Sequence, residues 1–227
     1  MAVAELPRRR FSSDEYERIV EAGILGPEDR VELIAGEIVE MAAIGSRHAA
    51  CVTKLQVQLS GCDALLRARQ PIRLDDRSEP EPDLALVRPR DDYYSAAHPG
   101  ADDVLLLIEV SDTSFPADLG TKLPLYAAAG VAEAWVVDLQ GGRVLVHRAP
   151  AADGYRLVSE HRRDDTLSAA AFPGPCARRR GRARLASWRT CRSRRSMLRC
   201  DSWSTSGGRL RIPWPEHSKR LRSTTNP

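Results

Sequence analysis

Residues 104–110 have the sequence VLLLIEV, and this run decides the fold because it is apolar on both faces until Glu109. A strand of this kind belongs in the middle of a sheet that is covered on both sides. Alternation places Leu105, Leu107 and Glu109 on one face. An ionised carboxylate there costs several kcal/mol unless it is paired or bound to a metal. Glu109 is therefore the first candidate functional residue, and the alternative is a strand-end carboxylate that reaches solvent or a neighbouring arginine.

The remaining sequence predicts a mixed α/β sheet with few helices. Residues 30–41, RVELIAGEIVEM, are typical of a hairpin that turns at Ala35-Gly36. Further strands are predicted at residues 64–70, 71–75, 84–87, 134–138, 143–148 and 155–160. Helices are predicted at residues 14–22 after a Ser12 or Ser13 cap, from His48 to Gly61, and at residues 118–129 after a start at Ser114 and Pro116.

Asp83 ends the acidic segment EPEPD, residues 79–83, directly before the strand at residues 84–87. Because Pro82 holds the chain extended, Asp83 can lie at the end of a strand adjacent to Glu109. Mg²⁺ is typically held by one or two carboxylates, with water and substrate phosphate oxygens in its other positions, as phosphodiester cleavage requires. The pair therefore predicts a site for a hard cation, and the alternative is a solvated acidic turn.

Lys122 is the third candidate. It lies four residues after Asp118, so both residues share one face of the helix that follows the Glu109 strand. A lysine in this position can steady an attacking water or the negative charge that develops on the phosphate. The alternative is a surface Asp–Lys pair worth ~0.3 kcal/mol.

Several other classes of protein are excluded by what the sequence lacks. It has no G-x-x-x-x-G-K-[ST] loop, no G-x-S-x-G elbow and no paired cysteine or histidine spacing typical of zinc sites. The longest apolar run, residues 104–108, is far shorter than the ~20 residues of a membrane-spanning helix. Residues 8–10 are three arginines with no apolar segment after them, so we expect no secretory signal and a cytoplasmic protein.

The chain resembles the Uma2 family of endonucleases, of the PD-(D/E)XK superfamily, in the order of its motifs. These are RVELIAGEIVEM, His48, SEPEPDLALV, LLLIEVSDTS and DLGTKLPLYAAAGVAEAWVVD. The resemblance covers roughly residues 11–174. It implies an α/β fold with a restriction-endonuclease-like mixed β-sheet flanked by a few helices, an N-terminal hairpin, and metal-dependent hydrolysis of DNA.

The resemblance also implies roles for individual residues. Asp83, Glu109 and the backbone carbonyl of Val110 would bind Mg²⁺, Glu32 would supply an additional acid and Lys122 the basic group. In the superfamily the lysine usually stands two residues after the second acid. That position here is Ser111, so the lysine must come from the helix. Glu32 can equally be only the polar residue of a hairpin face.

The charge divides the chain near Pro173. Residues 1–172 contain 19 Lys and Arg against 29 Asp and Glu, whereas residues 173–227 contain 15 against 2. We therefore predict a nuclease-like domain at residues 1–174 and an Arg-rich, disordered or irregular tail at residues 175–227, which has too few apolar residues for a core. A basic arm that binds nucleic acid would explain the tail. A frameshifted translation of a GC-rich gene explains it better, because the tail has no periodicity.

Two functions follow from these expectations. The first is a Mg²⁺-dependent endonuclease that hydrolyses DNA phosphodiester bonds and has no membrane partner. A homodimer is among its expected states, because such nucleases often cut as dimers. The second is a nuclease-fold protein that has lost catalysis and binds nucleic acid or another protein. The acidic body favours the second, because affinity for DNA normally needs a basic face.

Overall fold

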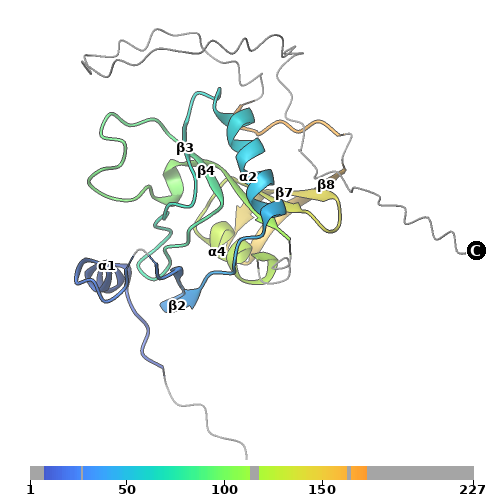
Figure 1. Ribbon diagram of the computed structural model, residues 1–227. Helices are drawn as coiled ribbons and strands as arrows, with labels where there is room; N and C mark the ends of the chain where they lie inside the picture. Colours follow the sequence, from blue (N-terminus) through green and yellow to red (C-terminus); the bar gives the residue numbers. More distant parts are fainter. Residues whose placement is uncertain (1–7, 27, 113–117, 163–164, 173–227) are drawn as a thin grey trace, which may run out of the picture.

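The computed structural model describes residues 8–26, 28–112, 118–162 and 165–172, which form an α/β domain around a six-stranded sheet (Figure 1). Its strands are β3 (Leu65–Arg67), β4 (Leu84–Val87), β5 (Val104–Ser111), β6 (Glu133–Asp138), β7 (Arg143–Ala151) and β8 (Gly154–Arg162). They lie side by side in chain order. All neighbours are antiparallel except β5 and β6, which are parallel. The predicted mixed sheet is confirmed.

Strand β5 is central, as its apolar sequence predicts. It pairs with β4 on one side and β6 on the other, and seven of its eight residues are buried. A parallel pair needs a crossover connection. Here the crossover includes a π-helical turn, η2 (Asp118–Lys122), and helix α4 (Leu123–Ala128). The crossover therefore returns the chain over the sheet directly after the strand that carries Glu109.

Two helices cover opposite faces of the sheet. Helix α2 (Ser46–Leu59) packs Leu55 in one apolar cluster with Ile108. Helix α4 packs Tyr126 in a second cluster with Leu107. Because successive strand residues point to opposite faces, Glu109 shares the α4 face with Leu107. Glu109 thus lies at the edge of the apolar core that α4 covers.

The N-terminal hairpin forms a separate two-stranded sheet of β1 (Val31–Ile34) and β2 (Glu37–Glu40). Its turn residues Ala35 and Gly36 both have positive φ, 49° and 82°, as a two-residue hairpin turn requires. A Cβ atom at residue 36 would lie 2.7 Å from the Cβ of Arg10, so only glycine fits. The predicted hairpin is confirmed.

The first helix, α1 (Ser13–Glu21), is also confirmed. The Ser12 hydroxyl accepts a hydrogen bond from the Glu15 amide, and the Glu15 carboxylate accepts one from the Ser12 amide. This capping box satisfies two backbone donors that the first turn would otherwise leave unpaired.

Several predicted elements differ from the structure; β7 and β8, for example, are longer than predicted. The strand predicted at residues 64–70 is only β3, because Arg69 has a positive φ of 51° and Pro71 follows. The strand predicted at residues 71–75 is wrong; there Arg73 and Asp75 make only isolated bridges, to Gly100 and Ser78. Helix α2 begins at residue 46, two residues before the predicted His48.

Two predictions fall outside the described residues: the helix start at Ser114 and Pro116, and the Arg-rich tail at residues 175–227. A short 3-10 helix, η1 (Ala101–Asp103), leads into β5. Within the described ranges, no helix combines the length and the apolar character needed to cross a membrane.

Candidate active site

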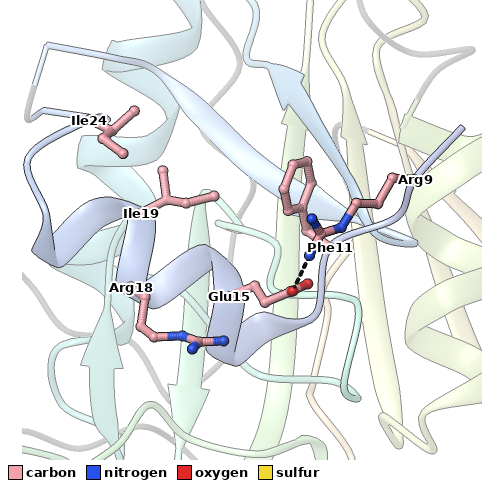
Figure 2. Close-up of a pocket in the computed structure, with 6 residues that line it drawn as sticks. All are labelled: Arg9, Phe11, Glu15, Arg18, Ile19 and Ile24. Carbon is pink, nitrogen blue, oxygen red and sulfur yellow. Dashed lines mark hydrogen bonds and ion pairs between the residues drawn. The ribbon is translucent and has the colours of Figure 1, made fainter.

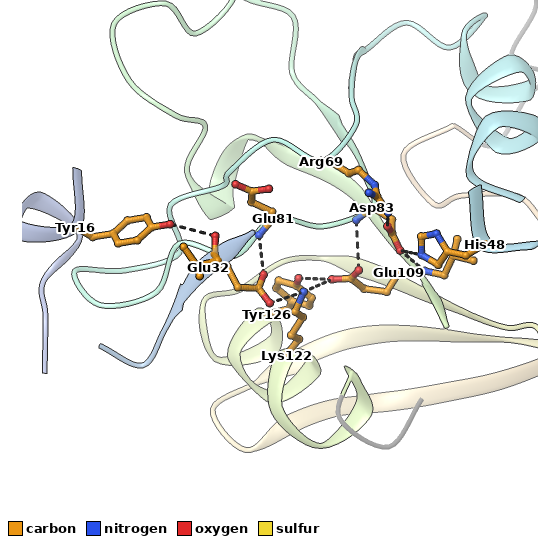
Figure 3. A network of polar contacts seen from close by, with 11 residues as sticks. Tyr16, Glu32, His48, Arg69, Glu81, Asp83, Glu109, Lys122 and Tyr126 are labelled. Carbon is orange, nitrogen blue, oxygen red and sulfur yellow. Dashed lines mark hydrogen bonds and ion pairs between the residues drawn. The ribbon is translucent and has the colours of Figure 1, made fainter. Parts of the chain in front are cut away.

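Strands β4 and β5 bring Asp83 and Glu109 to one end of the sheet (Figure 3). Their antiparallel register pairs Leu84 with Ile108, so Asp83 lies opposite Glu109. The Asp83 amide donates a hydrogen bond of 3.3 Å to Glu109 Oε2, and the Val110 amide donates one of 2.9 Å to Asp83 Oδ2. The structure therefore places the two predicted metal-binding acids, and the residue predicted to add its carbonyl, next to one another.

The carboxylate of Asp83 has three donors around it. Its Oδ2 accepts from the Val110 amide and lies 2.8 Å from His48 Nε2, while its Oδ1 accepts from Arg69 Nη2 at 3.2 Å. His48 is the third residue of α2, and its Nδ1 is buried without a hydrogen-bond partner among the described residues. Arg69 lies two residues after the end of β3. Helix α2 and the segment after β3 thus both contribute contacts to this acid.

The carboxylate of Glu109 contacts helix α4 and the turn before it. Tyr126 donates its hydroxyl hydrogen to Glu109 Oε1 at 2.6 Å, and Lys122 Nζ lies 3.6 Å from the same oxygen. Lys122 and Tyr126 are four residues apart, so both side chains point from one helical face. The Lys122 side chain is only 13% exposed, so it does not belong to a solvated helix surface. Lys122 therefore lies at the acidic site, where the family resemblance leads us to expect it.

The hairpin adds Glu32 to this cluster. Its Oε1 lies 2.9 Å from Lys122 Nζ, and its Oε2 accepts a 3.0 Å hydrogen bond from the Glu81 amide. The Tyr16 hydroxyl of α1 donates to the Val31 carbonyl at 3.2 Å, which holds the hairpin against α1 (Figure 3). All four predicted site residues, Glu32, Asp83, Glu109 and Lys122, consequently belong to one polar network.

Basic groups counter the acids of this network. Burial, followed by repulsion from Glu32, raises the pKa of Glu81, whereas Lys122, Arg30 and Arg69 each act to lower it. These three cations come from the crossover, the residue before β1 and the segment after β3. Positive charge from separate segments thus acts on Glu81, although burial and Glu32 outweigh it.

The donor chemistry of the cluster fits a hard divalent cation. Carboxylates of Asp83 and Glu109 and the carbonyl of Val110 are oxygen ligands, the type that Mg²⁺ prefers. Mg²⁺ keeps several waters and is commonly bound through one or two carboxylates rather than in a closed protein cage. In the described part of the chain, no group of three or more His, Cys, Asp or Glu side chains is arranged to hold a metal. The residues present fit the open type of site.

Glu79 is a buried acid four residues before Asp83. Its backbone amide donates to the Leu33 carbonyl, its side chain is 2% exposed, and its Oε2 is buried with no hydrogen-bond partner among the described residues. Burial raises the pKa of Glu79 to about 7. The surrounding charges are Glu17, Glu81 and Asp14, which raise this pKa, Arg73, which lowers it, and His98 at 3.6 Å.

Replacing Glu79 with glutamine is expected to stabilise the protein in a pH-dependent way. Because the folded pKa is above the unfolded value, folding favours the protonated acid, so wild-type stability falls as pH rises from about 4.5 to about 7. The variant lacks this loss, so its free energy of unfolding should exceed that of wild type by about 3 kcal/mol above pH 7 and by less than about 1 kcal/mol near pH 5. Urea unfolding at both pH values measures the difference. An equal gain in the free energy of unfolding at both pH values would contradict the raised pKa of Glu79.

Two surface hollows lie away from these acids. One, of about 330 Å³, lies between the N-terminal segment and α1 (Figure 2). It is lined by Arg9, Phe11, Glu15, Arg18, Ile19 and Ile24. A second hollow includes Ala35 and Ser78 near the hairpin turn. Neither is lined by Asp83, Glu109 or Lys122.

A mixed sheet in which two neighbouring central strands present acids beside a lysine has the architecture of a nuclease-like α/β domain. The same fold occurs in the crystal structure of "a putative nuclease belonging to DUF820 from Anabaena variabilis ATCC 29413", with a TM-score of 0.56 and 15% identity over 70% of this chain and 88% of that chain. The chain belongs to the Uma2 family, described as "Putative restriction endonuclease", which matches residues 13–178. No curated protein matches the chain. Family and fold are thereby confirmed.

Three residues of the network have no role predicted from the sequence. Tyr126 lies within the motif at residues 118–138 without a feature that marks it, and Arg69 lies outside the quoted motifs; their contacts with Glu109 and Asp83 depend on packing between distant segments. His48 stands out in the sequence only by its place in the motif order and near a helix start. A polar side chain in the first turn of an otherwise apolar-faced helix is the one available signal.

Proposed function

We propose that this chain is a Mg²⁺-dependent endonuclease that hydrolyses phosphodiester bonds in DNA. The observation that carries the proposal is the meeting of Asp83 and Glu109 at one end of β4 and β5, with Lys122 Nζ 3.6 Å from Glu109 Oε1. Membership of the Uma2 family supports the reaction class. Asp83, Glu109 and the carbonyl of Val110 would hold Mg²⁺, which when bound would supply positive charge beside the scissile phosphate and favour ionisation of water.

Lys122 would act on the substrate. Its ammonium group lies between Glu32 and Glu109, at 2.9 Å and 3.6 Å, so it is held in place by two acids. An ammonium group has three donors, so it can keep its contact with Glu32 and still donate to a phosphate oxygen. Lys122 would therefore stabilise the charge that develops as the phosphorus is attacked. Glu32 would serve as the additional acid that positions Lys122.

His48 and the Val110 amide would orient Asp83. Both donors contact Oδ2, so they fix the plane of the carboxylate and leave Oδ1 toward Arg69. Because the second ring nitrogen of His48 has no partner among the described residues, the imidazole is aligned through its contact with Asp83. His48 is consequently a positioning residue in this scheme.

The second candidate function, a binding module without catalysis, is favoured by one specific observation. The acids of the site already have basic partners within the protein: Asp83 has His48 and Arg69, and Glu32 has Lys122. A closed set of pairs of this kind can serve stability or binding specificity alone. DNA binding that does not depend on a metal, with no cleavage, is the result expected of such a module.

Incubation of the purified protein with supercoiled plasmid tests the proposal. We expect nicked and linear products in Mg²⁺, complete loss of cleavage after chelation with EDTA, and recovery when Mg²⁺ is added in excess. The reason is that the carboxylates of Asp83 and Glu109 cannot act as a Lewis acid. Without a metal, they neither polarise the phosphate nor favour ionisation of the attacking water. Cleavage that persists in EDTA would contradict the metal dependence. Absence of cleavage with Mg²⁺ and with Mn²⁺, together with retained DNA binding, would favour the binding module.

A further inference from the structure

The two oxygens of Asp83 are held by donors of different kinds. Oδ2 contacts the Val110 backbone amide, which is fixed by the sheet, and His48 on helix α2. Oδ1 contacts a guanidinium group, that of Arg69. Backbone and helix-borne donors move little, whereas a long arginine side chain can change its position by rotating its χ angles. Oδ1 is therefore the oxygen that can be released to another cation.

The contact of Arg69 with Asp83 is of the exchangeable type. One nitrogen, Nη2, donates at 3.2 Å, so the pair is not the short bidentate arrangement of the strongest arginine–carboxylate bonds. The Arg69 side chain is 30% exposed, against 12% for Asp83. The guanidinium thus borders solvent at the edge of an otherwise enclosed acid.

The backbone of Arg69 is held firmly although its side chain is partly exposed. Its amide donates to the Pro82 carbonyl at 3.2 Å, next to Asp83, and its φ is 51°, a left-handed conformation that a non-glycine residue adopts at a cost. This conformation follows closely on the end of β3 and turns the chain at Asp83. The side chain therefore starts from a fixed point beside the acid.

We infer that Arg69 occupies Oδ1 of Asp83 in the metal-free protein and moves to a DNA phosphate when Mg²⁺ binds. The inference rests on the proposed function, because it assumes that Asp83 is a metal ligand. A guanidinium and a divalent cation repel one another, so they cannot share one carboxylate oxygen without loss of affinity. A planar guanidinium binds a phosphate through two parallel hydrogen bonds, so displacement by the metal would release it to a suitable partner.

The first test measures Mg²⁺ affinity by isothermal titration calorimetry in the absence of DNA. Because Arg69→Gln removes the competing cation, we expect it to bind Mg²⁺ about tenfold more tightly than wild type. Arg69→Lys keeps the charge and should stay within about threefold of wild type. Arg47→Gln is the control: Arg47 makes a 3.2 Å contact with the carboxylate of Asp112 and a second one with the Leu139 carbonyl, and its side chain is 39% exposed.

The second test measures cleavage kinetics with the same variants. Loss of a phosphate contact should raise KM for DNA about tenfold in Arg69→Gln, with kcat changed less than about threefold, because the reacting atoms are not touched. The slope of log KM against log salt concentration should also fall by about one, because one phosphate contact is lost. Arg47→Gln should leave both constants and Mg²⁺ affinity close to those of wild type.

The outcomes separate this inference from the function on which it rests. Unchanged or weaker Mg²⁺ binding by Arg69→Gln, with the variant folded by circular dichroism, would overturn the inference and leave the endonuclease intact. A wild-type protein that binds no Mg²⁺ would overturn both. Tighter Mg²⁺ binding by Arg69→Gln without any cleavage by wild type would support the exchange at Asp83 and reject catalysis.

Discussion

Replacement of Glu109 with glutamine is expected to lower the rate of DNA cleavage by at least about 1,000-fold, equivalent to about 4 kcal/mol of transition-state stabilisation. The substitution keeps the shape of the side chain but removes the charge that would attract Mg²⁺ and that neighbours Lys122 at 3.6 Å. Asp83→Asn should have an effect of similar size, because the two acids would act as one metal-binding unit. Initial rates of plasmid nicking at saturating Mg²⁺ measure both effects.

A matched control distinguishes loss of the site from loss of general negative charge. Glu40 is an exposed carboxylate at the end of β2, and Glu40→Gln should cleave at the wild-type rate. Since Glu109 accepts a hydrogen bond from Tyr126, thermal unfolding of each variant must show that the fold is retained. Cleavage by a folded Glu109→Gln protein within tenfold of wild type would exclude Glu109 as a metal ligand.

The largest effect on stability is expected from Glu133→Ala. The Glu133 side chain is 1% exposed and accepts hydrogen bonds from Trp135 Nε1 at 2.6 Å, Arg148 Nη2 at 2.8 Å and the Ala170 amide at 2.6 Å. Alanine would remove the acceptor of the Trp135 and Ala170 donors and would leave Arg148 Nη2 with the Ser168 carbonyl alone. Breaking a buried pair by removal of one partner costs about 3–5 kcal/mol, so the free energy of unfolding should fall by this amount in urea denaturation.

An exposed pair on the same sheet provides the comparison. Glu160 on β8 lies 3.1 Å from Arg143 and 2.8 Å from Arg162, with 35% of its side chain exposed. Because exposed ion pairs contribute little, Glu160→Ala should cost less than about 1 kcal/mol. If the free energy of unfolding falls equally in the Glu133 and Glu160 variants, burial does not determine how much Glu133 contributes to stability.

The parts of the fold that depend on neighbouring residues are predictable from the sequence. The apolar run at residues 104–110 indicates a central strand, Ala35-Gly36 a hairpin turn, and Ser12 or Ser13 a helix cap; each is present, with Ser12 as the cap. These features follow from alternation, turn chemistry and capping, which act over a few residues. The prediction of a strand at residues 71–75 is wrong, because this segment makes bridges to loops rather than to a strand.

The candidate site is predictable only to the extent that its acids are unusual in sequence. Glu109 interrupts an apolar strand and Asp83 directly precedes one, so the sequence alone indicates that these two strand ends can meet. Arg69 and Glu133 give no such signal. Arg69 stands in a polar loop. Glu133 comes one residue before the predicted strand at 134–138, and the amide that bonds to its carboxylate belongs to residue 170, far along the chain. Contacts of this range are not encoded in any local pattern.

The hairpin is a sheet of its own, joined to the strand system through the Leu33–Glu79 bridge and the Glu81 amide rather than through a shared ladder. One of the two acids that contact Lys122, Glu32, thus lies on a ribbon outside the strand ladder, whereas the other, Glu109, belongs to that ladder. A substitution in the ribbon can therefore change the electrostatic environment of the lysine while the register that sets Asp83 opposite Glu109 stays the same.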